Sequence, residues 1–501
     1  MHLFALGSNG SGQLGIGHTE DVSSPTECLF ETSERHQGPS DENDNITRIV
    51  AGGNHTLLLT AKGAVWAAGL NGDGRCGENI TCIHAQGQDL HRDGEKNSSS
   101  TANEKKIPTA ATKQAQAQER DGDEQEDTLL RFRRVCIHDP ESGLTVEHFK
   151  HVAATWEGSL LVASVPKISK QNPSFSAEQM NRRGDDQSVS PEDDEEEDRI
   201  YVLGTGTKGE LGIGSQILHS GPSAPSYIPN FPPRPDPSEQ EPTPKITALA
   251  TGMTHTIAIL SNGQVYGWGS SRKGQLGPGN KATKIIWEPA RVDGIPFFAR
   301  SAVCGREFTV VLGDDCRRFV LLGERGMRWG VLGDFLSSSS AFSVASSSQH
   351  GDGNDEGVVE VNAVNGYTDI LASWNGVYVH VPPNPAGKSL SEEDSPATPS
   401  PPRPGHLIAW GRNDRGQHPP PTLPPPTTLA VGSEHVLALL EDGTVAAFGW
   451  GEHGNCGPET DARGNVAGTY NVISLPEDAR TAGGRVVGVG AGCATSWLIV
   501  S

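Results

Sequence analysis

A glycine-rich segment at residues 204–209 has the G-x-G-x-x-G spacing of a dinucleotide-binding turn, and it follows an apolar run. Such a turn holds a pyrophosphate only where a helix begins directly behind it, because the helix supplies the amides that bind the phosphates. Glu210, Leu211 and Gly212 come next and do not favour a helix. We therefore interpret the segment as a turn between strands and expect no bound cofactor.

Three histidines, His55, His255 and His435, each stand three residues after a glycine. Each belongs to a different segment without a neighbouring ligand, so we expect hydrogen bonds within the segment and no metal site. No Ser-His-Asp or paired-carboxylate arrangement stands out, so the sequence predicts a protein that is not an enzyme. The cysteines contain no C-x-x-C pair and lie at positions 28, 76, 82, 136, 304, 316, 456 and 493.

Two tryptophans, Trp156 and Trp374, stand where the other segments carry the glycine and histidine. A large aromatic residue on a loop is a candidate anchor for a protein partner, and the alternative for both is packing between neighbouring sheets. Further Arg and Trp residues, which interfaces favour, lie in loops for which the alternative is a solvated surface. The candidate partner-binding residues are Trp156, Glu157, Trp329, Trp374, Asn375, Arg412, Trp450, Glu452 and His453.

The elements that must position these residues are internal repeats. A Gly-x-x-Gly motif follows a short apolar run that itself ends in glycine, and Asn-Gly or Asp-Gly turns join pairs of apolar runs. These turns are a strong signal of a β-hairpin. Each repeat is thus a small antiparallel sheet that must pack against its neighbours to bury its faces. The motif occurs at residues 12–15, 74–77, 209–212, 274–277, 330–333 and 454–457, with a degraded copy at 416–419.

The two ends of the sequence each supply part of one repeat. The segment from Leu3 to Gly15 lacks the preceding strands of the other repeats, and the segment from Val486 to Val500 supplies them. Pairing the two ends closes a ring and protects the sheet edges, which an open solenoid would not do. The sequence therefore predicts an all-β fold, a single seven-bladed β-propeller over residues 1–501 whose N- and C-terminal strands share a blade.

Seven blades of roughly 50 residues leave about 150 residues over. We interpret five segments that are poor in apolar residues, several of them rich in charge or proline, as disordered insertions, which a propeller tolerates. They are residues 80–128, 165–198, 216–244, 335–356 and 382–405.

The composition excludes several classes of function. A formal net charge of −22 argues against direct DNA binding, since phosphate contacts need clustered Lys and Arg. No run of 18 apolar residues occurs, so we expect no membrane span. The N-terminus lacks the basic and apolar regions of a signal peptide, so we expect reduced cysteines and a cytoplasmic and nuclear location.

The repeat resembles that of the regulator of chromosome condensation family, whose fold is a seven-bladed β-propeller. The resemblance rests on residues 6–15, which read Leu-Gly-Ser-Asn-Gly-Ser-Gly-Gln-Leu-Gly, and on residues 252–269, and it covers nearly all of the chain outside the insertions. Residues 448–457 and the two tryptophan segments further resemble the family branch of the fungal α-tubulin suppressor.

The branch resemblance implies a non-enzymatic propeller, as a monomer or a heterodimer, that binds the small zinc-ribbon electron carrier of diphthamide synthesis. It also implies an indirect role with Elongator in modifying wobble uridines of tRNA. The founding member of the family implies an alternative, which is guanine-nucleotide exchange on a small GTPase or an adaptor role for one. That alternative favours a basic N-terminal arm, whereas this sequence opens on an expected strand.

Overall fold

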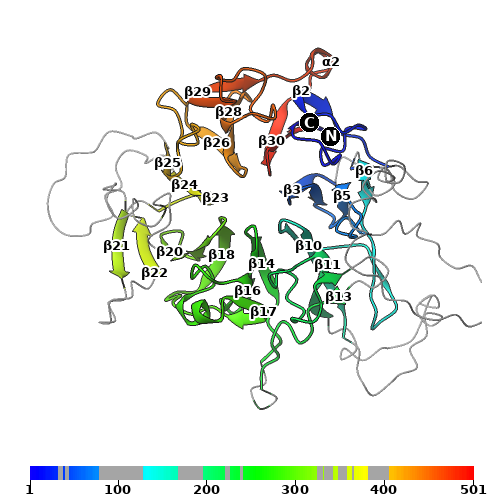
Figure 1. Ribbon diagram of the computed structural model, residues 1–501, viewed down its shortest axis with the longest axis vertical. Coiled ribbons are helices and arrows are strands. Elements are labelled where there is room, and N and C mark those ends of the chain that lie inside the picture. The colour runs from blue at the N-terminus through cyan, green and yellow to red at the C-terminus, as the bar shows by residue number, and fades with distance from the viewer. Residues whose placement is uncertain are drawn as a thin grey trace, which may run out of the picture.

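The computed structural model of the chain is a ring of seven antiparallel β-sheets around a central axis (Figure 1). This arrangement confirms the predicted all-β, seven-bladed propeller. The structure describes residues 1–31, 38–39, 44–77, 128–167, 196–220, 226–236, 238, 241–323, 331, 342–347, 358–363, 366–381 and 406–501.

The strands of a blade follow one another outward from the axis, and we number the blades from the one that holds both chain ends. Blade 1 contains β30 (Val486–Ala491), β31 (Thr495–Val500), β1 (His2–Gly7) and β2 (Val22–Glu27). Blade 2 contains β3 (Ile46–Ala51), β4 (His55–Thr60), β5 (Val65–Leu70) and β6 (Thr128–Arg134). Blade 3 contains β9 (His151–Ala154), β10 (Gly158–Pro166) and β11 (Glu196–Thr205), which pairs with both β12 (His219–Ser220) and β13 (Ser226–Tyr227).

The remaining blades repeat this order. Blade 4 contains β14 (Ile246–Thr251), β15 (His255–Leu260), β16 (Val265–Ser270) and β17 (Ile285–Arg291). Blade 5 contains β18 (Ala299–Cys304), β19 (Phe308–Gly313), β20 (Arg318–Gly323), β22 (Val358–Ala363) and β21 (Phe342–Ser347). The described part of blade 6 contains β23 (Asp369–Ser373), β24 (Gly376–Val381) and β25 (His406–Gly411), and blade 7 contains β26 (Pro426–Val431), β27 (His435–Leu440), β28 (Val445–Trp450) and β29 (Asn465–Ile473).

Three short elements lie in the connections between these strands. They are the hairpin of β7 (Ile137–His138) and β8 (Thr145–Val146), the 3-10 helix η1 (Pro278–Thr283) and the helix α2 (Glu477–Thr481). Within the described ranges, the chain forms no helix long and apolar enough to cross a membrane.

The N- and C-terminal strands close the ring inside blade 1. Strand β1 pairs antiparallel with β31 over its whole length, from His2 opposite Val500 to Gly7 opposite Thr495. Leu3 and Trp497 are both almost fully buried in the same apolar cluster. The predicted pairing of the two chain ends is therefore confirmed.

The three repeated histidines join blades 2, 4 and 7 to the blades that follow them, which corrects our expectation of a hydrogen bond within the segment. The Nε2 atom of His255 lies 3.0 Å from the hydroxyl of Thr309 in blade 5, and that hydroxyl donates to the carbonyl of Gln275 in blade 4. His55 and His435 make the equivalent contacts with Ser159 and Ser496. Each of these histidines is the first residue of the second strand of its blade, and its imidazole faces the neighbouring sheet. Its hydrogen-bond partner therefore comes from that sheet.

Two of the five expected insertions contain ordered structure, which is a correction. Residues 216–244 include β12 and β13, and Ile228 and Phe231 are buried there. The Phe231 ring lies 5.4 Å from Tyr266 and 6.0 Å from Trp268 of blade 4, so these apolar residues fill a gap between blades. Residues 335–356 include β21 at the edge of blade 5.

The other three expected insertions lie largely outside the described residues. The structure describes only Thr128 of residues 80–128 and none of residues 382–405. In the range 165–198 it describes 165–167 and 196–198, which are parts of β10 and β11 together with Lys167.

Candidate partner-binding face

One face of the propeller carries the turns between the first and second strands of all seven blades. Because strands alternate in direction, the third strand of each blade ends at the same face, so the loops with the Gly-x-x-Gly motif lie there too. We call it the turn face. All the candidate residues that the structure describes lie on it: Trp156, Glu157, Trp374, Asn375, Arg412, Trp450, Glu452 and His453.

Backbone hydrogen bonds join neighbouring turns around the axis. The amide of Gly53 donates to the carbonyl of Trp156 at 2.9 Å, and the amide of Trp156 donates to Met253 at 3.1 Å. On the other side of the ring, the Trp374 carbonyl accepts from Arg306 at 2.8 Å and its amide donates to Ser433 at 3.1 Å. The two tryptophans are thus held by their main chains in equivalent turns of blades 3 and 6.

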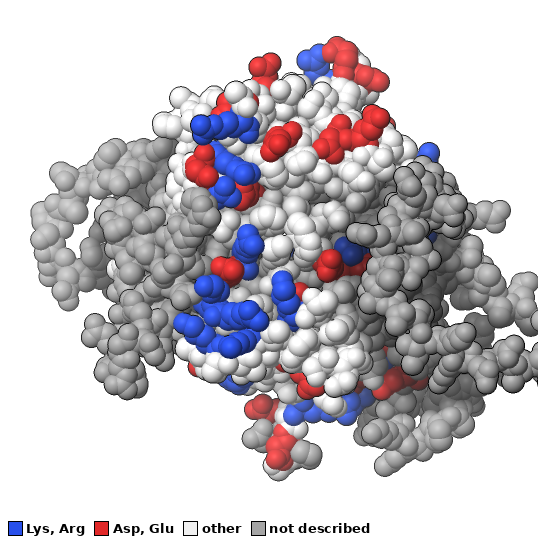
Figure 2. Space-filling view, in the orientation of Figure 1, with Lys and Arg blue, Asp and Glu red and all other residues white. Residues whose placement is uncertain are grey.

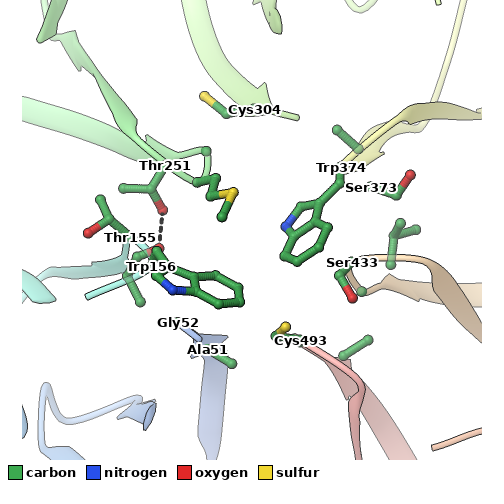
Figure 3. Close-up of a pocket in the computed structure, with 18 residues that line it drawn as sticks. Ala51, Gly52, Thr155, Trp156, Thr251, Cys304, Ser373, Trp374, Ser433 and Cys493 are labelled. Carbon is green, nitrogen blue, oxygen red and sulfur yellow. Dashed lines mark hydrogen bonds between the residues drawn. The ribbon is translucent and has the colours of Figure 1, made fainter. Parts of the chain in front are cut away.

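The two tryptophan rings meet over the central channel. Figure 3 shows them projecting toward each other across its mouth, and their centroids are 5.6 Å apart at an interplanar angle of 54°. Both side chains are half-buried. The alternative interpretation, a ring packed between two blades, does not describe this position, although the Trp156 ring does lie against Gly53 of the neighbouring turn.

A small cavity lies in the channel, and the two tryptophans are among the residues that line it. It holds about 140 Å³ and is lined by residues of all seven blades, among them Met253, Cys304, Ser433 and Cys493 (Figure 3). Burial raises the pKa of the Cys304 thiol to about 12 and that of the Cys493 thiol to about 11, so both are neutral at pH 7. The cavity therefore suits an uncharged or apolar group.

A second cluster of candidate residues joins blades 7 and 1. The indole nitrogen of Trp450 donates to Glu452 at 3.1 Å, and the His453 ring meets the Trp450 ring edge-on at 5.3 Å. The Nδ1 atom of His453 lies 2.7 Å from a carboxylate oxygen of Asp21 in the loop after β1. Trp450 and His453 are half-buried and Glu452 is exposed, so this cluster presents aromatic and acidic groups together.

Arg412 belongs to a network of ion pairs beside that cluster. Its guanidinium bonds Asp414 and Glu434, and the hydrogen bond from Arg412 helps to hold the pKa of the Asp414 carboxyl below its usual value. Arg415 pairs with Glu434 at 3.1 Å and places its guanidinium 4.8 Å from the Trp450 ring. The cations of this part of the face are therefore neutralised within the protein.

Asn375 connects the two groups of candidate residues. Its carbonyl accepts a hydrogen bond from the amide of Arg412 at 2.8 Å, next to Trp374 in the same turn. Glu157 is exposed beside Trp156, and its carbonyl accepts from the amide of Thr205. Trp329 lies outside the described residues.

Sequence reasoning missed the residues that complete the channel mouth. Met253, Ser433 and Cys493 occupy the same turn in blades 4, 7 and 1 as the two tryptophans do in theirs. The repeat spacing that placed Trp156 and Trp374 would also have placed these three. Among the described residues, no group of three or more His, Cys, Asp or Glu is arranged to hold a metal ion.

Sequence comparison relates the repeats to a known family. One model of the regulator of chromosome condensation (RCC1) repeat matches residues 2–59 and 262–312, and a second matches residues 46–75, 246–275 and 427–455. An RCC1 repeat-containing protein of Schizosaccharomyces pombe is 26% identical over 99% of this chain and 98% of its own length. The mouse secretion-regulating guanine nucleotide exchange factor is 24% identical over 98% of this chain and 82% of its own. These matches show that parts of the chain are similar to the RCC1 repeat.

Solved structures agree with the fold. The chain is similar to Prp20p of Saccharomyces cerevisiae, with a TM-score of 0.58 and 15% identity over 99% of this chain and 90% of that one. It is also similar to human WBSCR16, with a TM-score of 0.57 and 14% identity over 100% of this chain and 98% of that one. The fold is therefore that of the RCC1-type seven-bladed propeller.

Proposed function

We propose that this RCC1-repeat propeller is a non-enzymatic scaffold that binds a small protein partner on its turn face. The observation that carries the proposal is the pair of half-buried rings, Trp156 and Trp374, over the channel mouth. Binding energy concentrates in a few anchors of this kind, and Trp is the most enriched among them. A backbone already fixed by hydrogen bonds to the adjacent turns also loses little entropy on binding.

The partner in this proposal is the small zinc-ribbon electron carrier of diphthamide synthesis. Through it, the propeller supports formation of diphthamide and, indirectly, Elongator-dependent modification of tRNA wobble uridines. The support is the resemblance of residues 448–457 and of the two tryptophan turns to the branch of the fungal α-tubulin suppressor. Trp450, Glu452 and His453 belong to that segment and lie together on the turn face.

Binding between the two purified proteins tests the proposal. Isothermal titration should give a one-to-one complex with the zinc-ribbon protein, and the double variant Trp156→Ala and Trp374→Ala should weaken it strongly. Trp287→Ala is the matched control, because Trp287 is also half-buried but lies on the outer strand β17. Absence of binding by the unmodified chain would overturn the proposal.

Exchange of guanine nucleotide on a small GTPase is the second candidate, and the names of the relatives favour it. The mouse relative is called a secretion-regulating guanine nucleotide exchange factor. Prp20p, at 15% identity, was described together with its binding to Gsp1p and histones. Release of labelled GDP from a panel of small GTPases, measured with and without the propeller, separates this candidate from the first.

A further inference from the structure

Four exposed cations lie on the turn face in the neighbouring blades 4 and 5. Arg272, Lys281 and Lys284 belong to the loop between β16 and β17, and Arg306 belongs to the turn between β18 and β19. Figure 2 shows Lys and Arg concentrated over this part of the ring, beside the central channel. We call these four residues the cationic patch.

The cationic patch is built on a fixed backbone. The amide of Ser271 donates to the carbonyl of Lys284 at 2.8 Å, which closes the loop, and the hydroxyl of Thr309 in β19 bonds the carbonyl of Gln275 in the same loop at 2.8 Å. The amide of Arg306 bonds Trp374 in the next blade. The patch therefore keeps its place next to the channel mouth.

The cationic patch takes no part in the ion pairs of the described residues, although Glu307 follows Arg306 in the same turn. None of the four side chains makes an ion pair with a described residue, although the sequence holds 62 Asp and Glu against 40 Lys and Arg. On the same face in blade 6, by contrast, both Arg412 and Arg415 are paired with carboxylates. Unpaired cations gathered in an acidic protein leave a local positive potential that attracts an acidic ligand.

The opposite side of the channel carries the opposite charge. Glu20 and Asp21 in the loop after β1 are exposed, and so is Glu452 after β28. Figure 2 shows Asp and Glu over that side of the ring. Complementary electrostatic potentials determine the orientation of a bound ligand as well as its rate of association. A ligand that is negative at one end and neutral or basic at the other is thus oriented across the channel.

We infer that the cationic patch docks an acidic segment of a protein partner. This inference and the proposed function have in common only that both place a ligand on the turn face. The inference does not depend on the identity of the partner protein. A nucleic acid fits less well, because a uniform polyanion is repelled by the acidic side of the same face and by the net charge of −22. A short acidic peptide segment can occupy the patch without crossing the channel.

Fluorescence anisotropy with a labelled octaglutamate peptide tests this inference. At 50 mM salt the unmodified chain should bind the peptide saturably, and binding should weaken at 200 mM salt because the contact is ionic. The variant Arg272→Glu with Lys281→Glu should raise the Kd at least tenfold. Its control is Arg317→Glu with Arg485→Glu, which changes the net charge equally with two exposed cations at the opposite face, and it should change the Kd less than twofold.

Three results would overturn the inference, provided that melting curves show all variants folded. They are an unchanged Kd in the patch variant, an equal rise in the control variant, and tighter binding of a twelve-nucleotide single-stranded DNA than of the peptide at the same salt. The assay contains no zinc-ribbon protein and no GTPase. Its result is therefore independent of the titration that tests the proposed function.

Discussion

At the scale of single residues, Trp374 can lose its ring without losing its place in the fold. Its amide and carbonyl bond the turns of blades 7 and 5, while the half-buried side chain lines the channel mouth and contacts the Trp156 ring. For Trp374→Ala we expect partner binding to weaken by about 1–4 kcal/mol and the melting temperature to change little. Titration calorimetry and thermal melting of the same variant measure both. A loss of stability of about 3–5 kcal/mol with normal affinity would instead identify a core residue.

Gly53 sets the position of the other ring. A Cβ at this residue would lie 2.8 Å from a ring carbon of Trp156, closer than real side chains approach, so Gly53→Ala must displace the indole from the channel mouth. We expect a red shift of the tryptophan emission, and no such shift when Trp156 is already replaced by Phe. Gly10→Ala is the control, because a Cβ there meets nothing within 4 Å.

At the scale of elements, the buried histidines make the contact between blades sensitive to acid. Burial lowers the pKa of His55 to about 3 and that of His255 and His435 to about 4. In the unfolded chain these rings titrate near pH 6.5, so below that value the unfolded state binds more protons. The stability that the neutral rings contribute is complete above pH 6.5 and is lost as the pH falls toward 4.

This linkage gives a measurable slope. Between pH 7 and pH 5.5, each histidine should lower the free energy of unfolding by roughly 1 kcal/mol. Urea titrations at the two pH values should show this fall for the unmodified chain, and His435→Gln should remove about one third of it. Equal slopes in the two proteins would mean that the pKa of His435 is the same in the folded and the unfolded chain.

Local signals in the sequence predict the blades. The features that the sequence did not predict depend on contacts between residues far apart in the chain. The Asn262-Gly263 turn and the Gly-x-x-Gly loops are defined within ten residues or so, and they placed each sheet correctly. Phe231 stands in a proline-rich segment, and only the approach of Trp268 from blade 4 makes a buried site for it. The partner of His55 is Ser159, 104 residues away, which spacing within one repeat cannot reveal.

The candidate site divides in the same way. Repeat position predicted that Trp156 and Trp374 occupy equivalent turns, and the structure places them so. Their contact depends on the curvature of the whole ring, which no single repeat specifies. The cationic patch was not predicted. Arg306 lies in a turn that contains neither tryptophan nor histidine, and a strongly negative net charge does not show that cations are grouped at one place.

At the scale of the whole molecule, stability depends on the closure in blade 1. Trp497, Leu498 and Val500 of β31 are almost fully buried, and burial of each large apolar side chain contributes about 1.5–3 kcal/mol. Their sum is comparable with the total stability of a typical domain. Deletion of residues 486–501 also leaves β1 without its partner, so we expect a marked fall in melting temperature or loss of soluble protein.

A circular permutant separates the closure itself from the position of the chain ends. His2 lies opposite Val500 in the β1–β31 ladder, so a short glycine-rich linker can join the two ends as a hairpin turn. New ends placed within residues 382–405, which we expect to be an insertion, keep every strand of blade 1. The permutant should therefore stay soluble and melt within a few degrees of the parent, while the deletion variant does not. Melting curves of the three proteins decide the matter, because a stable deletion variant would show that the ring holds without the shared blade. An unstable permutant beside a stable parent would place an essential part of the fold in residues 382–405.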